Sequence, residues 1–293
     1  MTKAKLSLEE RDKKKQEERK AVEAALAKLA NFHTRHEIVH ADSKKLKLNP
    51  DSVDLIVTSP PYYNAKEYSQ WPTVEAYLDD MKKIFTECFR VLKPGRRLCL
   101  NISDIPIKGE SGVKWLPLGG MLLKVCADIG FELSDRIFWF KTPLKGFQYG
   151  SLPFPPSPLI CDSIEYIYVL RKPGKSDYKY VSKDFKEASR LLREEYAEFT
   201  KQIWTIRRVR LSDNMDGHIA PFPYEIPYRC IKLYSFVGDL VFDPFGGSGT
   251  TGLAAKRTHR NSCMYEINQD YVNMMYNNLQ NAELFQSDEV VLI

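Results

Sequence analysis

The sequence has few features of a metal-binding, disulfide-linked or membrane protein. Its six cysteines are scattered without a Cys-x-x-Cys pair, which disfavours a zinc knuckle and a dense disulfide framework. No apolar run reaches the ~20 residues needed to cross a bilayer, and the N-terminus opens with lysines instead of a signal-peptide core. From these absences we expect reduced core thiols, no metal and no membrane contact, in a soluble cytoplasmic protein.

The charge balance is only mildly basic. Lysine and arginine number 43 against 38 acidic residues, for a formal net charge of +5, which suits nucleic acid but is common in proteins that never bind it. Hydrophobic residues make up 43% of the 293 positions, enough for one large or two small cores. Function must therefore be inferred from motifs.

The first 30 residues predict a helical extension. They are polar and highly charged, and Ser7 and Glu10 have the spacing of a capping box. The basic block at residues 11–15 could contact phosphates, but Glu17 and Glu18 interrupt the basic segment. A solvated helix face is therefore the favoured interpretation of this block.

Residues 31–293 predict an α/β domain with a mostly parallel, doubly wound sheet. Short β-branched runs alternate with helical stretches, which is typical of βαβ units. Strands are expected at 53–57, 97–102, 136–141, 163–170, 240–243 and 262–265. Helices are expected at 73–92, 116–129, 183–201, 223–234, 250–258 and 269–282.

Two segments interrupt this alternation. Residues 142–161 are dense in proline and glycine, and residues 172–216 are basic and rich in tyrosine. Loops longer than ~12 to 15 residues in a compact domain are usually functional or disordered. We expect substrate recognition in these two insertions.

A glycine-rich turn joins the strand at 240–243 to the helix at 250–258. This strand-turn-helix position is where an open α/β sheet holds a nucleoside-containing ligand. The spacing is not G-x-G-x-x-G, and no Gly-Lys-Ser/Thr follows, so a ligand with little phosphate is favoured. Glu266 ends the next strand, where a carboxylate can accept both ribose hydroxyls. Together these features favour a nucleoside cofactor over the alternative of a solvated strand-end glutamate.

The sequence Thr58-Ser59-Pro60-Pro61-Tyr62 directly follows the strand at 53–57. Two prolines stop the strand and fix the backbone, which leaves the carbonyls of Ser59 and Pro60 free to accept hydrogen bonds, while Tyr62 offers a flat face to a base. An exocyclic amino group is a poor nucleophile because its lone pair is delocalised, and accepting both of its hydrogens would localise that pair. An ordinary proline-containing loop is the alternative.

These residues resemble the amino-methyltransferases of DNA, which are marked by an Asp/Asn/Ser-Pro-Pro-aromatic tetrapeptide and a Phe-x-Gly-x-Gly turn, here at residues 245–249. The resemblance spans about residues 39–279 and implies a Rossmann-like fold and S-adenosyl-L-methionine as the cofactor. The tetrapeptide precedes the glycine turn, which is similar to the circularly permuted beta subgroup. In that subgroup the long insertion is the target-recognition region.

The resemblance also implies roles for individual residues. The catalytic residues, which would bind a base flipped out of duplex DNA, are Ser59, Pro60, Pro61 and Tyr62. The cofactor-binding residues are Asp42, His218, Pro221, Phe222, Asp243, Pro244, Phe245, Gly246, Gly247, Ser248, Gly249, Thr250 and Glu266. The candidate DNA contacts are Lys141, Lys145, Lys172, Arg207, Arg208 and Arg210.

Serine at the first position of the tetrapeptide is similar to cytosine-N4 enzymes. The resemblance thus implies methylation of cytosine N4 in double-stranded DNA, with adenine N6 as the alternative and an amino group in RNA less favoured. Family habit implies a restriction-modification or solitary role, a possible cognate endonuclease, and a monomer or homodimer. A non-enzymatic nucleic-acid-binding module and a dehydrogenase remain as alternatives of a different class.

Overall fold

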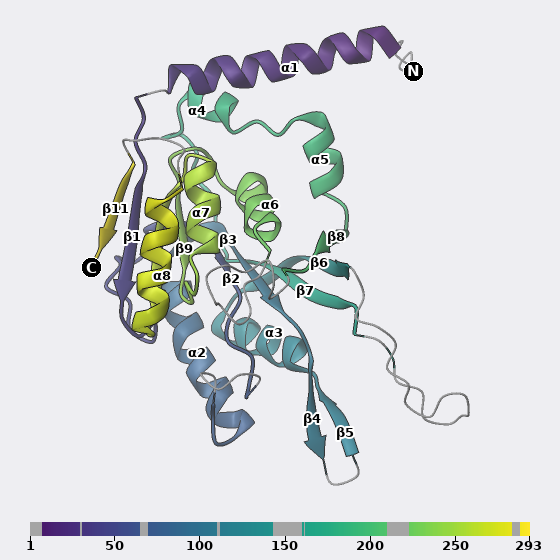
Figure 1. Ribbon diagram of the computed structural model, residues 1–293, viewed down its shortest axis with the longest axis vertical. Coiled ribbons are helices and arrows are strands. Elements are labelled where there is room, and N and C mark those ends of the chain that lie inside the picture. Colours follow the sequence, from purple (N-terminus) through teal and green to yellow (C-terminus); the bar gives the residue numbers. More distant parts are fainter. Residues whose placement is uncertain are drawn as a thin grey trace.

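A nine-stranded sheet forms the centre of the molecule (Figure 1). The computed structural model describes residues 8–29, 31–64, 70–109, 112–142, 160, 162–209, 223–282 and 288–293. The strand order is β11-β1-β10-β9-β2-β3-β7-β6-β8, and β7 alone among these strands runs antiparallel to its neighbours. The strands are β1 (Arg35–His40), β2 (Val53–Thr58), β3 (Leu92–Ile102), β6 (Glu132–Thr142), β7 (Ile164–Arg171), β8 (Ile203–Arg207), β9 (Leu240–Asp243), β10 (Asn261–Glu266) and β11 (Glu289–Leu292).

Helices cover both faces of the sheet. Along β2, Ile56 packs into the cluster that contains α2 and α3, whereas Leu55 and Val57 pack into the cluster that contains α6 and α7. A central parallel strand that is buried on both faces reads as a continuous apolar run. The helices are α1 (Leu8–Lys28), α2 (Val74–Val91), α3 (Leu118–Ile129), α4 (Lys183–Ala188), α5 (Arg193–Phe199), α6 (Glu225–Tyr234), α7 (Thr250–Arg257) and α8 (Gln269–Gln280).

The connection from α2 to β3 differs from its prediction. Thr73 caps α2 by accepting a hydrogen bond from the Ala76 backbone N–H at 3.1 Å, as its position before the helical pattern suggests. Strand β3 begins immediately after the helix, at Leu92, so Lys93-Pro94-Gly95 lies inside the strand and does not precede it. The register against β2 shifts there, and Gly95 has a φ of 75°. Because glycine adopts a positive φ without strain, the strand continues through this shift in register.

The second predicted insertion, residues 172–216, contains regular structure that differs in part from its prediction. The helix expected at 183–201 is two short helices, α4 and α5, because Ser182 caps the first and the Glu195 side chain caps a new start at Leu192. Strand β8 follows and extends the sheet. The helix expected from Leu116 begins at Leu118, because the preceding residues pair in a hairpin of β4 (Ile105–Gly109) and β5 (Gly112–Leu116).

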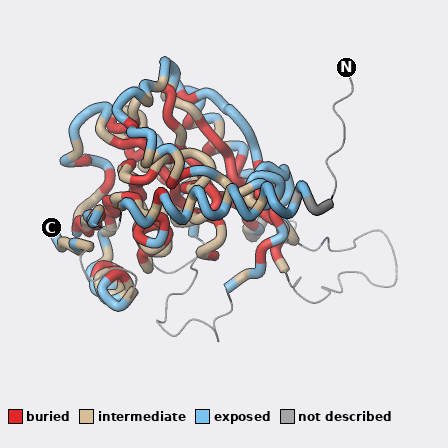
Figure 2. The backbone as a smooth tube through the Cα atoms, turned by 90° about the horizontal axis from the view of Figure 1, so that it is seen from above, coloured by how far each residue is buried: buried red, intermediate tan, exposed pale blue. Residues whose placement is uncertain are grey.

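Helix α1 lies at the amino-terminal edge of the sheet, against α4 (Figure 1). It is exposed over most of its length (Figure 2), and Ala25 is its one described residue in the buried class. Lys15 and Arg19 from its predicted solvated face lie near Glu194 of α5, at 3.3 and 3.8 Å. The helix is therefore held by a small apolar contact and by surface ion pairs, which are individually weak.

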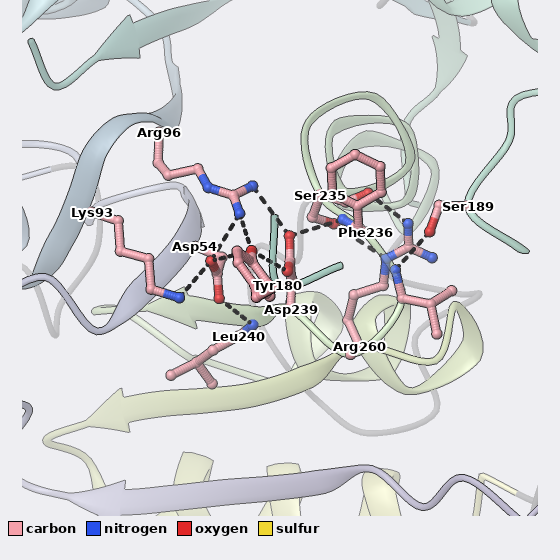
Figure 3. Close-up of polar contacts among 12 residues, drawn as sticks. Asp54, Lys93, Arg96, Tyr180, Ser189, Ser235, Phe236, Asp239, Leu240 and Arg260 are labelled. Carbon is pink, nitrogen blue, oxygen red and sulfur yellow. Dashed lines mark hydrogen bonds and ion pairs between the residues drawn. The ribbon is translucent and has the colours of Figure 1, made fainter. Parts of the chain in front are cut away.

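A buried polar cluster attaches the second insertion to the same edge (Figure 3). The Tyr180 hydroxyl lies 3.2 Å from Asp54 of β2 and 3.0 Å from Asp239, and it also contacts Arg96 of β3. Arg96 is 2% exposed and pairs with Asp54 at 3.0 Å and with Asp239 at 3.2 Å. Buried charges of this kind are stable only when paired. The insertion from Lys172 to α5 is thereby held at the edge where the strands begin.

Candidate active site

The candidate functional residues gather where the parallel strands end. Thr58 ends β2, Asp243 ends β9 and Glu266 ends β10, and these three strands lie at the centre of the sheet. His40, at the end of β1, pairs with Glu266. In open α/β sheets this carboxyl edge is where ligands bind.

The glycine turn has the strand-turn-helix geometry that the sequence predicts. Gly249 precedes α7 with a φ of 84°, and a Cβ at this position would lie 2.6 Å from Met275 Cγ. Both the left-handed conformation and the close approach of α8 therefore require glycine. The turn is closed by Gly246 N–H donating to the Tyr265 carbonyl at 2.8 Å.

Asp243 joins the turn to the strand that carries the tetrapeptide. Its carboxylate accepts hydrogen bonds from the hydroxyls of Thr58 and Thr251, both at 2.7 Å, and from the Phe245 backbone N–H at 3.0 Å. The side chain is fully enclosed, with 1% of the residue exposed. Burial raises the pKa of Asp243 to about 6, although the three hydrogen bonds oppose this shift.

Two carboxylates lie at the ends of neighbouring strands beside the turn. Glu266 accepts from the Gly247 backbone N–H and from the Asn268 backbone N–H, each at 2.9 Å. Asp42 follows β1, and its carboxyl is 43% exposed, with Lys44 Nζ at 3.3 Å. A carboxylate oxygen accepts more than one hydrogen bond, so both groups retain acceptor capacity for a nucleoside. The donor and acceptor set fits the predicted cofactor.

The tetrapeptide leaves β2 and brings Tyr62 to a carboxylate that the sequence analysis did not identify. Tyr62 Oη donates to Glu165 Oε2 at 2.9 Å, and the Ser59 hydroxyl acts as a donor that lowers the pKa of Tyr62. Glu165 is the second residue of β7, whose reversed direction brings its amino end to the carboxyl edge of the sheet. Burial and the nearby Glu165 charge raise the pKa of Tyr62.

Glu165 lies in a cluster of polar side chains. Asn101 Nδ2 donates to it at 3.2 Å, and Lys141 Nζ lies 3.6 Å from its other oxygen. Lys141 also bonds to Asp162 at 2.7 Å and is 5% exposed. Burial raises the pKa of Glu165, and the Lys141 charge and the two hydrogen bonds oppose the shift. Lys141 is therefore an internal partner of Glu165 rather than a surface cation.

An open cavity of ≈ 320 Å³ adjoins this cluster. Its walls include Asp104 and Tyr166, whose side chains contact at 3.2 Å, and Trp115 of the hairpin, which is 50% exposed. Asp162 also lines it. The cavity thus connects the buried Glu165 cluster to solvent through Asp162 and presents an exposed aromatic face.

The remaining candidate DNA contacts fall in different places. Arg207 ends β8 at the carboxyl edge and is exposed, and the Arg208 backbone N–H bonds to Thr142 at 2.9 Å. Lys172 instead lies at the opposite edge, with Nζ 2.6 Å from Asp51. The predicted site residues outside the described part of the chain are Lys145, Arg210, His218, Pro221 and Phe222.

No set of three or more potential metal ligands occurs among the described residues, and no described helix is long and apolar enough to span a membrane. Five of the six cysteines are buried free thiols, and Cys161 lies outside the described ranges.

Comparison with protein families identifies the family to which the chain belongs. Residues 53–277, which include the tetrapeptide, the glycine turn and Glu266, match the model of the N6/N4 methyltransferase family, described as DNA methylase. The chain belongs to this DNA methylase family. Membership confirms the predicted methyltransferase fold class and S-adenosyl-L-methionine as the cofactor. The family includes both N6 and N4 enzymes and does not distinguish between the two target bases.

This methylase chain covers very different shares of two of its relatives. The type II beta methyltransferase M.BslI of Bacillus sp. (strain NEB-606) is 32% identical over 275 residues, 88% of this chain but 29% of the relative. The type II methyltransferase M.MjaI of Methanocaldococcus jannaschii is 33% identical over 269 residues, 80% of this chain and 88% of the relative. The chain thus spans less than a third of the first relative and most of the second.

Solved structures share the architecture of the methylase. A DNA modification methylase of Thermus thermophilus, crystallised with S-adenosyl-L-methionine, is 30% identical with a TM-score of 0.72, over 87% of this chain and 98% of that one. The cytosine-N4-specific PvuII methyltransferase is 20% identical with a TM-score of 0.61, over 88% of this chain and 95% of that one. The second likeness supports the fold alone.

Proposed function

We propose that this methylase transfers a methyl group to N4 of a cytosine flipped out of duplex DNA. The observation that carries the proposal is the hydrogen bond from Thr58 to Asp243, 2.7 Å long, which joins the end of the tetrapeptide strand to the glycine turn. A base held at Ser59 and a cofactor held at the turn would then lie side by side. Holding two reactants in fixed geometry supplies much of the catalysis that an enzyme needs.

The cofactor would be held by the turn and by the two strand-end carboxylates. Glu266 would accept the ribose hydroxyls and Asp42 would meet the adenine amino group, while Gly249 allows the backbone to approach closely. S-adenosyl-L-methionine supplies an electrophilic methyl group when it is bound. The three residues outside the described part, His218, Pro221 and Phe222, complete the proposed cofactor set by resemblance.

The target base would lie against the tetrapeptide. The carbonyls of Ser59 and Pro60 and the Ser59 hydroxyl oxygen are acceptors for the amino hydrogens, and the Tyr62 ring is a stacking surface. Flipping costs a few kcal/mol of unstacking, which contacts to the DNA backbone offset. Arg207 and Arg208 are the described candidates for those contacts, together with Lys145 and Arg210 outside the described ranges. Lys141 and Lys172 are not part of this proposed DNA face.

Two finer features of the proposal rest on the sequence. Serine at position 59 supports cytosine over adenine as the target. The order of tetrapeptide before glycine turn supports the beta subgroup, as does the name of the relative M.BslI. The type II names of several relatives support a modification role paired with a cognate endonuclease.

The test is to identify the methylated nucleoside. The purified protein is incubated with methyl-labelled S-adenosyl-L-methionine and mixed-sequence duplex DNA, and the digested nucleosides are analysed by mass spectrometry. We expect N4-methylcytosine, and we expect Tyr62→Ala to abolish it while Tyr196→Ala, at an exposed tyrosine of α5, does not. N6-methyladenine as the product would contradict the assignment of cytosine, and label in RNA alone would contradict DNA as the substrate.

A further inference from the structure

A chain of hydrogen bonds leads from the tetrapeptide to a buried carboxylate. The Ser59 hydroxyl acts on Tyr62 as a hydrogen-bond donor that lowers the pKa of Tyr62, and Tyr62 Oη donates to Glu165 Oε2 at 2.9 Å. An ionised carboxylate only accepts, so Tyr62 must point its hydrogen toward Glu165, and Ser59 can then point its own toward Tyr62. This orientation leaves the lone pairs of the Ser59 oxygen free on the side away from Tyr62.

Glu165, the last group in this series of hydrogen bonds, is suited to receive a proton. The Glu165 side chain is 14% exposed, so ionisation is disfavoured by burial, and the pKa of the carboxyl is raised. Asn101 and Lys141 keep it oriented, at 3.2 and 3.6 Å. Tyr62, whose own pKa is raised by the same burial and by the Glu165 charge, remains a protonated link in the chain.

We propose that Glu165 is the terminal acceptor of the proton that the target amino group loses during methyl transfer, with Ser59 and Tyr62 as the relay. This inference rests on the proposed function and applies equally to an amino group of cytosine or adenine. The amino nitrogen uses its lone pair to form the new N–C bond, and the bond between that carbon and the cofactor sulfur breaks with its electron pair on sulfur. The nitrogen then carries a positive charge until a proton leaves it.

The relay removes that proton without creating a free charge in the site. The nitrogen's proton passes to Ser59 Oγ as Ser59 gives its own to Tyr62, and Tyr62 gives its own to Glu165. Both hydroxyls end neutral and Glu165 ends as a carboxylic acid. Lys141 lies between Glu165 and Asp162, whose carboxyl is 43% exposed and lines the open cavity. The ammonium group gives one of its protons to Asp162 and takes up the proton of Glu165, and Asp162 then loses its proton to solvent between turnovers.

The experiment compares single-turnover methylation rates for the full chain and its variants, with enzyme in excess over unmethylated mixed-sequence DNA. Glu165→Gln keeps an acceptor for Tyr62 but cannot take up a proton, and Tyr62→Phe keeps the aromatic ring but breaks the relay. We expect each to slow the transfer by about 100-fold, within the usual range for general base catalysis, and the double variant to be no slower than either single variant. Glu132→Gln, at an exposed glutamate at the start of β6, is the matched control.

Two further readouts separate the relay from a structural role. The wild-type rate should rise with pH as Glu165 ionises, and this limb should be absent in Glu165→Gln. In the protein without DNA, the infrared band of the protonated Glu165 carboxyl should persist to higher pH in Tyr62→Phe, because Tyr62 stabilises the carboxylate. This second measurement needs no methylation and is therefore independent of the proposed function. A wild-type rate for Glu165→Gln, single effects that multiply in the double variant, or an infrared titration unmoved by Tyr62→Phe would each overturn the relay.

Discussion

Asp243→Asn should change the pH dependence of stability in a calculable way. Burial raises the pKa of Asp243 to about 6, from 3.8 in the unfolded chain. The folded state therefore binds a proton more tightly than the unfolded state, and the stability present below pH 3.8 is lost as the pH rises to 6. At ~1.36 kcal/mol per pKa unit, this loss is about 3 kcal/mol. Asparagine has no such titration.

The assay is urea unfolding followed by tryptophan fluorescence at several pH values between 4 and 7. The free energy of unfolding of Asp243→Asn minus that of the wild type should increase by about 3 kcal/mol across this range. A difference that stays flat would refute the reasoning, since it would mean that the bonds from Thr58, Thr251 and Phe245 cancel the burial penalty. Asp243→Ala is the comparison, and it should be less stable than the asparagine variant by about 2 kcal/mol or more, because it leaves buried donors without acceptors.

Three further outcomes can be measured. His36 has the opposite effect on stability, because burial lowers its pKa to about 4. The stability that it contributes above pH 6.5 is lost as the pH falls to 4, by about 3 kcal/mol. His36→Asn should remove this pH dependence of the free energy of unfolding. Glu266→Gln should weaken S-adenosyl-L-methionine binding about tenfold or more by calorimetry, because hydrogen bonds to a charged group contribute ~1.5 to 3 kcal/mol; unchanged affinity would contradict the role of the carboxylate. Gly249→Ala should unfold at least ~2 kcal/mol more easily, because its Cβ meets Met275 and its φ is positive, whereas Gly120→Ala, in an exposed part of α3 with open space around it, should be neutral or up to ~1 kcal/mol stabilising.

Most of the elements near the site could be predicted from the sequence because each carries a local signal. Strand β9 lies at the predicted residues, and α7 begins at the predicted Thr250. A short apolar run followed by glycines indicates a strand and a turn without reference to the rest of the chain. The glycine turn of the proposed cofactor site could therefore be predicted from one segment.

The partner of Tyr62 could not be found in this way. The sequence predicts the strand at 163–170 but not its direction, and only an antiparallel β7 brings Glu165 to the edge where Tyr62 lies. Strand direction is set by how the whole sheet pairs, and no residue of the strand encodes it. The partners of Lys141 could not be predicted for the same reason, since Asp162 and Glu165 come from a loop and from a different strand.

Strand β8 shows a different limit. Residues 203–207 alternate between exposed and buried positions, which is the usual signature of an edge strand. The pattern is easily overlooked because it lies inside a basic segment that the sequence analysis interprets as a single insertion. The hairpin of β4 and β5 also alternates, with Ile105 and Ile107 in one strand and Val113 and Trp115 in the other, but the sequence analysis did not interpret these short runs as strands.

The order of strands along the chain has a consequence for synthesis on the ribosome. Strand β2 leaves the ribosome long before its neighbour β9, since Thr58 and Asp243 are 185 positions apart. Strand β1 likewise cannot pair with β10 until that later strand has been synthesised. One edge of β2 and both edges of β1 therefore stay unpaired until β9, β10 and β11 have been synthesised, and unpaired strand edges expose a nascent chain to aggregation. A nascent chain that lacks β9 and β10 also lacks the proposed cofactor site, so we expect it to be inactive.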